Sequence, residues 1–127
     1  MLTPDTSEIS GPIEGGTYPA EIVGAEPGVS KTGGSKLVVK FGVTVGEKTV
    51  PRQVHMPVTG AGAFGFDALL RACHFDDAAN RFKDKNLPAS DKEFDEQQLV
   101  GQKLFVVIEP DTYNGQLTDK ITGYLRA

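Results

Sequence analysis

Residues 31–54 read KTGGSKLVVKFGVTVGEKTVPRQV, and they contain the most regular alternation in the chain. Over residues 36–45, one side of an extended chain is apolar and the other is mostly polar, which is typical of a strand with one buried face. Gly46-Glu47 follows, and a glycine at the first of two loop positions suits a type II′ hairpin turn. A second strand over residues 48–56 is therefore predicted to pair with the first. The apolar side consists of Leu37, Val39, Phe41, Val43 and Val45.

Three more strands are predicted, over residues 17–25, 103–109 and 116–125. Asn114-Gly115 separates the last two of them and is the strongest short-range hairpin signal. Pro19 lacks a backbone N–H, so the first strand should be an edge at that point, or be bulged or bent.

One helix is predicted from the spacing of four apolar residues, Phe66, Leu69, Leu70 and Cys73. Residues 76–90 are expected to form a loop with a turn or two, and residues 91–99 a second short helix with Ser90 or Asp91 as its cap. The result is a mainly β protein with five strands and a helical segment between the third and the fourth. This is the order of the OB-fold, a small, partly open Greek-key barrel. We expect a flexible acidic arm over residues 1–15 and a single OB-fold domain over residues 16–127.

The charge is distributed unevenly along the chain. The 127 residues carry a formal net charge of −4, which argues against binding of duplex DNA through global positive charge. Residues 1–28 hold five acids and no base, whereas residues 29–60 hold five bases and one acid. The positive excess therefore lies on the predicted hairpin, and this local asymmetry indicates an anionic partner.

The hairpin cations are the first candidate binding residues, because binding of single strands requires cations that meet phosphates along a groove. The two paired strands are expected to present four of them close together, with the fifth in the preceding loop. A solvated sheet face also carries lysines, so each one taken alone has a structural interpretation. These candidates are Lys31, Lys36, Lys40, Lys48 and Arg52.

Exposed aromatic rings are the second requirement, since they stack on bases. Phe105 alternates with Leu104 and Val106, so we expect it to point outward unless a helix or a partner subunit covers it, with Lys103 on the same side. Tyr113, near the tip of the last hairpin, is the first candidate for stacking, although turn chemistry also tolerates a tyrosine there. His55 is a candidate contact to a base or phosphate, with a structural role as the alternative. Phe41, Phe66 and Cys73 are expected in the core.

Four short motifs resemble one family. They are Gly16-Thr17-Tyr18 at the first strand, SKTGGSKL at residues 30–37, LVGQKL at residues 99–104 and KITGY at residues 120–124. Together they resemble phage and prophage single-stranded-DNA-binding proteins of OB type, many of which are catalogued only as a domain of unknown function. The resemblance covers residues 15–125. It implies sequence-independent binding of single-stranded DNA in phage replication or recombination. Phage or host replication proteins and a second copy of the chain are further expected partners.

Enzyme signals are poor, and neither catalytic residues nor a cofactor is predicted. His55, Cys73 and His74 lack the repeated close spacing of a zinc site, and Cys73 alone cannot form an intrachain disulfide. No leader and no apolar run of bilayer length is visible, so an intracellular protein with no membrane partner is expected. The resemblance to phage proteins implies that this compartment is the cytoplasm of a bacterial host. The alternatives are a phage structural or assembly protein of β-barrel or sandwich type, or an OB module that binds another protein.

Overall fold

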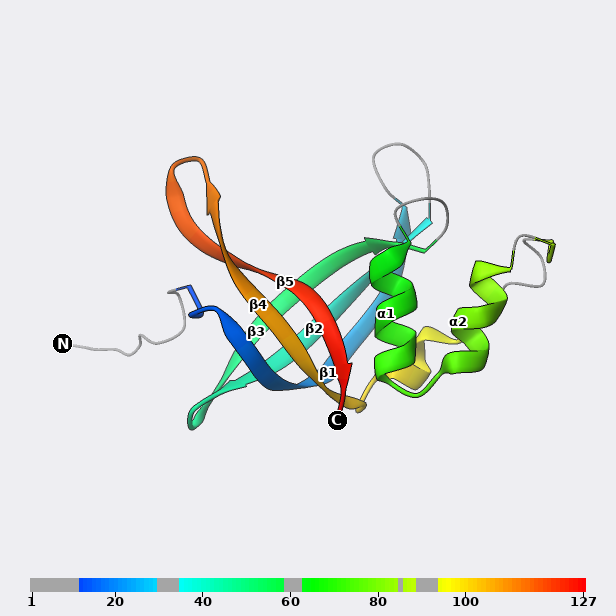
Figure 1. Ribbon diagram of the computed structural model, residues 1–127, viewed down its shortest axis with the longest axis horizontal. Coiled ribbons are helices and arrows are strands. Elements are labelled where there is room, and N and C mark those ends of the chain that lie inside the picture. Colours follow the sequence, from blue (N-terminus) through cyan, green and yellow to red (C-terminus); the bar gives the residue numbers. More distant parts are fainter. Residues whose placement is uncertain (1–11, 30–34, 59–62, 85, 89–93) are drawn as a thin grey trace.

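Five antiparallel strands form one strongly curled sheet, with two helices beside it (Figure 1). The computed structural model describes residues 12–29, 35–58, 63–84, 86–88 and 94–127, with all side chains in them except those of Val29 and Tyr113. The order in the sheet is β3-β2-β1-β4-β5. The strands are β1 (Gly16–Val29), β2 (Ser35–Val45), β3 (Lys48–Pro57), β4 (Lys103–Tyr113) and β5 (Gln116–Arg126). The helical elements are α1 (Phe64–Ala72), α2 (Asp76–Lys83) and the 3-10 turn η2 (Glu96–Leu99).

Both predicted two-residue hairpin turns are confirmed. Gly46 has φ +63° and joins β2 to β3 so that Val45 lies opposite Lys48. Asn114 and Gly115 have φ +52° and +77°, the pair of left-handed residues that a type I′ turn requires. Glycine and asparagine adopt positive φ values more readily than other residues do, and both hairpin turns, which set the register of their strands, depend on this.

Pro19 lies in a central strand, yet at a place where that strand is paired on one side only. It lies opposite Phe105 of β4, whereas the pairing of β1 with β2 begins at Ala20. A register shift follows between Ile22 and Gly24, which is the irregularity predicted for this strand. The missing N–H of proline is thus accommodated where β1 has no partner on its β2 side.

The first helix agrees with its predicted stripe, because Phe66, Leu69, Leu70 and Cys73 are all buried. The prediction of a loop over residues 76–90 is wrong for its first half, which forms α2. Two features explain this helix: Ala78 and Ala79 are buried, and acidic residues in the first turn and basic residues in the last suit the helix dipole. So short an apolar stripe, made of two alanines, is a weak signal in the sequence.

The second predicted helix is reduced to the 3-10 turn η2 within the described residues. Asp95 caps this turn, since its carboxylate accepts a hydrogen bond from the backbone N–H of Gln97 at 3.0 Å. The predicted caps Ser90 and Asp91 lie outside the described residues.

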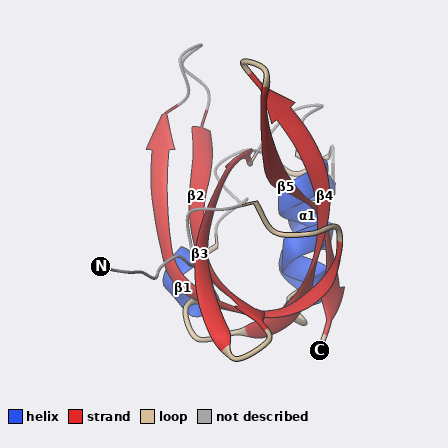
Figure 2. Ribbon diagram, turned by 90° about the vertical axis from the view of Figure 1, so that its left-hand side faces the viewer, coloured by secondary structure: helices blue, strands red, loops and turns tan. Residues whose placement is uncertain are grey.

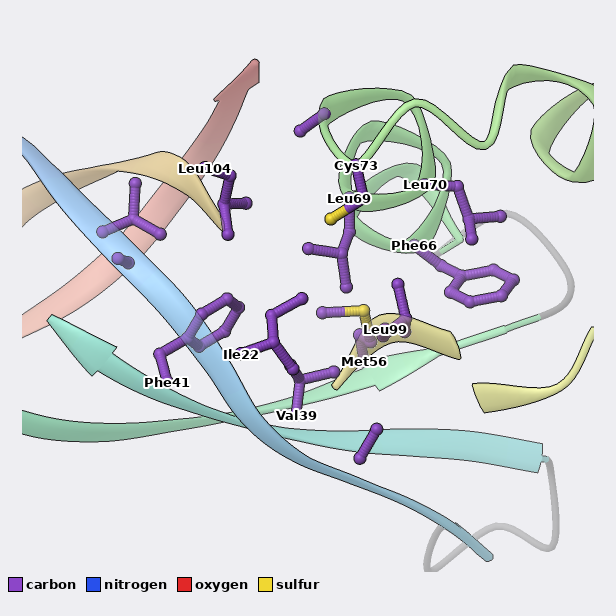
Figure 3. Close-up of a cluster of buried hydrophobic side chains, with 14 of the residues drawn as sticks. Ile22, Val39, Phe41, Met56, Phe66, Leu69, Leu70, Cys73, Leu99 and Leu104 are labelled. Carbon is purple, nitrogen blue, oxygen red and sulfur yellow. The ribbon is translucent and has the colours of Figure 1, made fainter. Parts of the chain in front are cut away.

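The core lies between the concave side of the sheet and α1, with Leu99 of η2 closing one side (Figure 3). Ile22, Val39 and Phe41 face α1 from the sheet, and each is at most 1% exposed. Phe41 also stacks on Tyr124 of β5, with ring centroids 5.9 Å apart. The expectation that Phe41, Phe66 and Cys73 belong to the core is confirmed, and burial raises the pKa of the Cys73 thiol to about 11.

The sheet is open, because β3 and β5 are its two outer strands and do not pair with each other. Figure 2 shows β1, β2 and β3 on one side of the curled sheet and β4 and β5 on the other, with α1 beside the second group. α1 packs most extensively against β5 and also contacts β3, so it covers part of the separation between them. The order of five strands with helices between the third and the fourth is confirmed, and the chain is a mainly β protein with an antiparallel open sheet.

Truncation of Leu69 tests the packing of α1 on the sheet. Leu69 is fully buried, so Leu69→Ala should lower the free energy of unfolding by about 2 to 5 kcal/mol through lost burial and a residual cavity. Urea unfolding followed by circular dichroism measures this change. Leu117→Ala is the matched control: Leu117 is 65% exposed, and its truncation should cost less than about 0.5 kcal/mol. Equal effects of the two substitutions would contradict the position of α1.

Candidate nucleic-acid interface

The register of β2 and β3 divides the predicted cation cluster between the two faces of the sheet. Lys40 lies opposite Gln53, whereas Arg52 lies opposite the core residue Phe41. Opposite residues in an antiparallel pair project from the same face, so Arg52 shares the face of the core. Lys48 lies opposite Val45 and shares that face too. The prediction that the hairpin presents all four of its strand cations together is therefore wrong.

Arg52 instead makes an ion pair with Asp119 of β5, the strand at the other edge of the sheet. Its Nε donates to Asp119 Oδ1 and its Nη2 to Asp119 Oδ2, both at 2.8 Å. The Asp119 side chain is 3% exposed and that of Arg52 is 23% exposed, so the pair is largely shielded from water. A two-pronged contact of this kind is the strong form of an arginine–carboxylate interaction. It joins β3 to β5, which have no backbone pairing.

The N-terminal segment meets the same carboxylate. The backbone N–H of Ile13 donates to Asp119 Oδ2 at 2.7 Å, and the Ile13 side chain is buried. Nearby, the hydroxyl of Tyr18 donates to the carbonyl oxygen of Glu14 at 2.6 Å. The hydrogen bond from Arg52 and, secondarily, that from Ile13 hold the pKa of Asp119 below its ordinary value, against the opposite effect of burial.

The outer face of β2 and β3, away from the core, carries a smaller polar cluster. Lys36 Nζ donates to Nδ1 of His55 at 3.0 Å, and Nε2 of the same ring lies 2.8 Å from the side-chain amide of Gln53. Lys40, opposite Gln53, pairs with Glu26 of β1 at 3.2 Å. Three predicted residues, Lys36, Lys40 and His55, therefore share one face of the sheet.

Glycines of β1 allow both lysine side chains to lie flat against the sheet. A Cβ atom added to Gly24 would be 3.3 Å from Cδ of Lys40, and one added to Gly28 would be 3.2 Å from Cε of Lys36. Each lysine stem thus crosses the neighbouring strand at a position with no side chain. The two lysine stems therefore pack over the backbone of β1 at Gly24 and Gly28.

Lys103 and Phe105 lie on a different part of the outer face. Lys103 is opposite Glu21, and Phe105 is opposite Pro19 in β1 and Leu125 in β5. Phe105 is half-buried while its neighbours Leu104 and Val106 are buried, so its outward direction is confirmed. Both residues pair with the first half of β1, whereas Lys36 and Lys40 pair with its second half.

Two predicted contacts cannot be placed by their side chains. Lys31 lies outside the described residues. Tyr113 ends β4 opposite Gln116, which confirms the backbone position near the tip of the hairpin, and its side chain is outside the description.

Sequence reasoning missed Gln53 and Asp119. For Gln53 a signal was present, because counting outward from the two-residue turn places it opposite Lys40 and beside His55 on one face. For Asp119 no local signal existed, since its partner Arg52 is 67 positions away in the chain.

No protein-family model matches the chain, and no curated protein matches it. Among the described helices, none has the length and apolar character needed to span a bilayer. Within the described part of the chain, the side chains of His, Cys, Asp and Glu form no group of three that could hold a metal ion.

Replacement of Asp119 tests the connection between β3 and β5. Asp119→Asn removes the charge partner of a shielded arginine and should lower the free energy of unfolding by about 2 to 4 kcal/mol near neutral pH. Because the pKa of Asp119 is lowered in the folded protein, the stabilisation is complete above the pKa of the unfolded chain, about 4. It is lost as the pH falls further, through the folded pKa. The wild-type advantage in urea unfolding should therefore shrink below about pH 4.

The control for this experiment is Asp76→Asn, which removes the partner of Arg126 in an ion pair whose two side chains are each 48% exposed. It should cost less than about 1 kcal/mol. An Asp119 variant as stable as the Asp76 variant would show that Arg52 and Asp119 contribute nothing to holding the sheet together.

Proposed function

We propose that the chain is a partly open OB-type barrel that binds single-stranded DNA without strong sequence preference. The strand order, with β1 between β2 and β4 and the helices between β3 and β4, supports the OB assignment. The Arg52–Asp119 pair supports it as well, because side chains join the two strands whose pairing would close the barrel.

The observation that carries the binding proposal is the cluster of Lys36, Lys40, His55 and Gln53 on one exposed face of β2 and β3. Ammonium groups meet phosphates, and the imidazole and amide groups can hydrogen-bond to phosphate, sugar or base. In OB-folds the face of strands 2 and 3 is the surface that binds oligonucleotides. Lys40 pairs with Glu26, and the Lys40 side chain is 47% exposed. Because a surface ion pair of this kind is weak, a phosphate can replace the Glu26 carboxylate.

The proposed interface relies more on phosphates than on stacking. Phe105 is half-buried between Pro19 and Leu125 and lies on the β4 part of the outer face, so little of its ring is open to a base. An interface of this kind should have strong salt dependence and little base preference, because counterion release supplies its free energy. The resemblance to phage proteins extends the proposal to phage replication or recombination in a bacterial cytoplasm, with replication proteins as further partners.

A protein-binding module is the second candidate. It is favoured by exposed apolar side chains: Phe64, at the start of α1, is 81% exposed, and Leu117, on the β4–β5 hairpin, is 65% exposed. A phage structural or assembly role would use the same features. Either would leave oligonucleotide affinity weak and independent of salt.

A fluorescence titration with labelled oligo-dT at about 0.05 M and about 0.2 M salt tests the proposal. Wild type should bind more tightly at the lower salt. Log affinity should fall as log salt rises, and each neutralised phosphate should make this negative slope steeper by about 0.7. The double variant Lys36→Glu, Lys40→Glu should lose roughly tenfold or more in affinity at the lower salt.

The matched control is Lys48→Glu with Lys103→Glu. It changes the net charge by the same amount at two predicted residues that lie away from the cluster. It should lose much less affinity than the first pair. Equal losses would mean that only total charge matters, and binding that ignores salt would refute the proposal. Arg52 is avoided because its replacement would disrupt the contact with Asp119.

A further inference from the structure

We propose that His55 and Lys36 form a proton-dependent phosphate site, which loads a phosphate of the single strand when the His55 ring is protonated. The inference rests on the proposed function and adds its regulation by pH. Its basis is the contact of 3.0 Å between Lys36 Nζ and His55 Nδ1 on the outer face of β2 and β3.

The chemistry of this contact specifies the protonation of the ring. A lysine ammonium group has only donors, so Nδ1 of His55 must be the acceptor and the ring must be neutral, with its proton on Nε2. The Gln53 amide nitrogen lies 2.8 Å from Nε2, and a half-turn of the amide, which exchanges its nitrogen and oxygen, lets the oxygen accept from the Nε2 hydrogen. Without a ligand, Lys36 is therefore engaged by the ring.

Protonation reverses this arrangement. A protonated imidazole has a hydrogen on both nitrogens, so Nδ1 can no longer accept from Lys36 and two positive groups face each other. A phosphate oxygen between them would accept from both and would remove the repulsion. Binding of a phosphate and binding of a proton therefore favour each other at this site, as linkage requires.

Among the charged groups described on the face of His55, the carboxylate in register with it is that of Glu26, across Val38. Lys36 and Lys40 of β2 lie on the same face of the sheet as the His55 ring. Glu26 of β1 pairs with Lys40 on this face. Within β3 the contact is Gln53, which is uncharged.

The helix packed against β3, α1, contacts the sheet from the core side, opposite the face that carries His55. Asp67 and Arg71 of α1 pair with each other at 3.1 Å, and Arg71 further donates to Asn80. The protonated ring and Lys36 thus form a place where an added phosphate would complete the charge balance.

Oligo-dT affinity measured at several salt concentrations, at about pH 6 and about pH 8, tests the inference. Wild type should have a slope of log affinity against log salt that is steeper by about 0.7 at the lower pH, corresponding to one more neutralised phosphate. At 0.1 M salt this amounts to roughly fivefold tighter binding. His55→Gln, which keeps a neutral hydrogen-bonding group, should have the same affinity and the same salt slope at both pH values, whatever its affinity relative to wild type.

The control is His74→Asn, which removes the other histidine of the chain. His74 is exposed with φ +67°, a conformation that asparagine tolerates, so this variant should keep the full pH response. A nuclear magnetic resonance titration of the His55 ring provides a second readout. Added oligo-dT should shift the ring's titration toward higher pH in wild type and leave it unchanged in Lys36→Met.

The outcomes separate the two proposals. Binding that is salt-dependent but responds to pH equally in wild type and His55→Gln would overturn the inference and leave the proposed function standing. Absence of binding at both pH values would refute the proposed function, and the inference with it. A ring titration that ignores oligo-dT while binding proceeds would also overturn the inference.

Discussion

The contact between Arg52 and Asp119 is the constraint that joins the two outer strands of this sheet, β3 and β5. The outer strands β3 and β5 have no backbone pairing, so side chains must join them. Arg52 and Asp119 do so through two hydrogen bonds, and beside them Phe41 of β2, which lies opposite Arg52, stacks on Tyr124 of β5. Burial at this junction also raises the pKa of the Tyr124 hydroxyl to about 12. The ion pair is largely shielded from water, so removal of either group would leave the other charge unpaired at a considerable cost in stability.

This structural use of Arg52 changes the electrostatics of the proposed interface. An arginine bound to a buried carboxylate contributes little field to the outer face, and Lys40 is balanced there by Glu26. The interface is therefore not a simple basic groove. It is the outer face of a curled sheet and carries mixed charge; lysine stems cross the glycines of β1 there, and a histidine engages Lys36. Under the proposed function, such a surface would contact phosphates locally and would exert little long-range attraction on them.

Much of the fold could be predicted because its signals are local. Alternation of apolar residues marked the strands, left-handed turn residues marked both hairpins, and helical spacing marked α1. The second helix α2 was missed because its buried stripe consists of two alanines, which periodicity detects poorly. Of the candidate site, the outward direction of Phe105 and the position of Tyr113 near the hairpin tip were predictable from alternation and turn chemistry alone.

By itself, the sequence determined the five strands, the two tight turns and the concentration of positive charge on one hairpin, since each depends on residues close together in the chain. The two-residue turn even implied that Arg52 lies opposite Phe41, because a period of two assigns every residue of β3 to a face. Only the tertiary structure decided which cations are available. Asp119 is 67 positions from Arg52, and the curvature of the sheet, which no local pattern encodes, brings the carboxylate to the arginine.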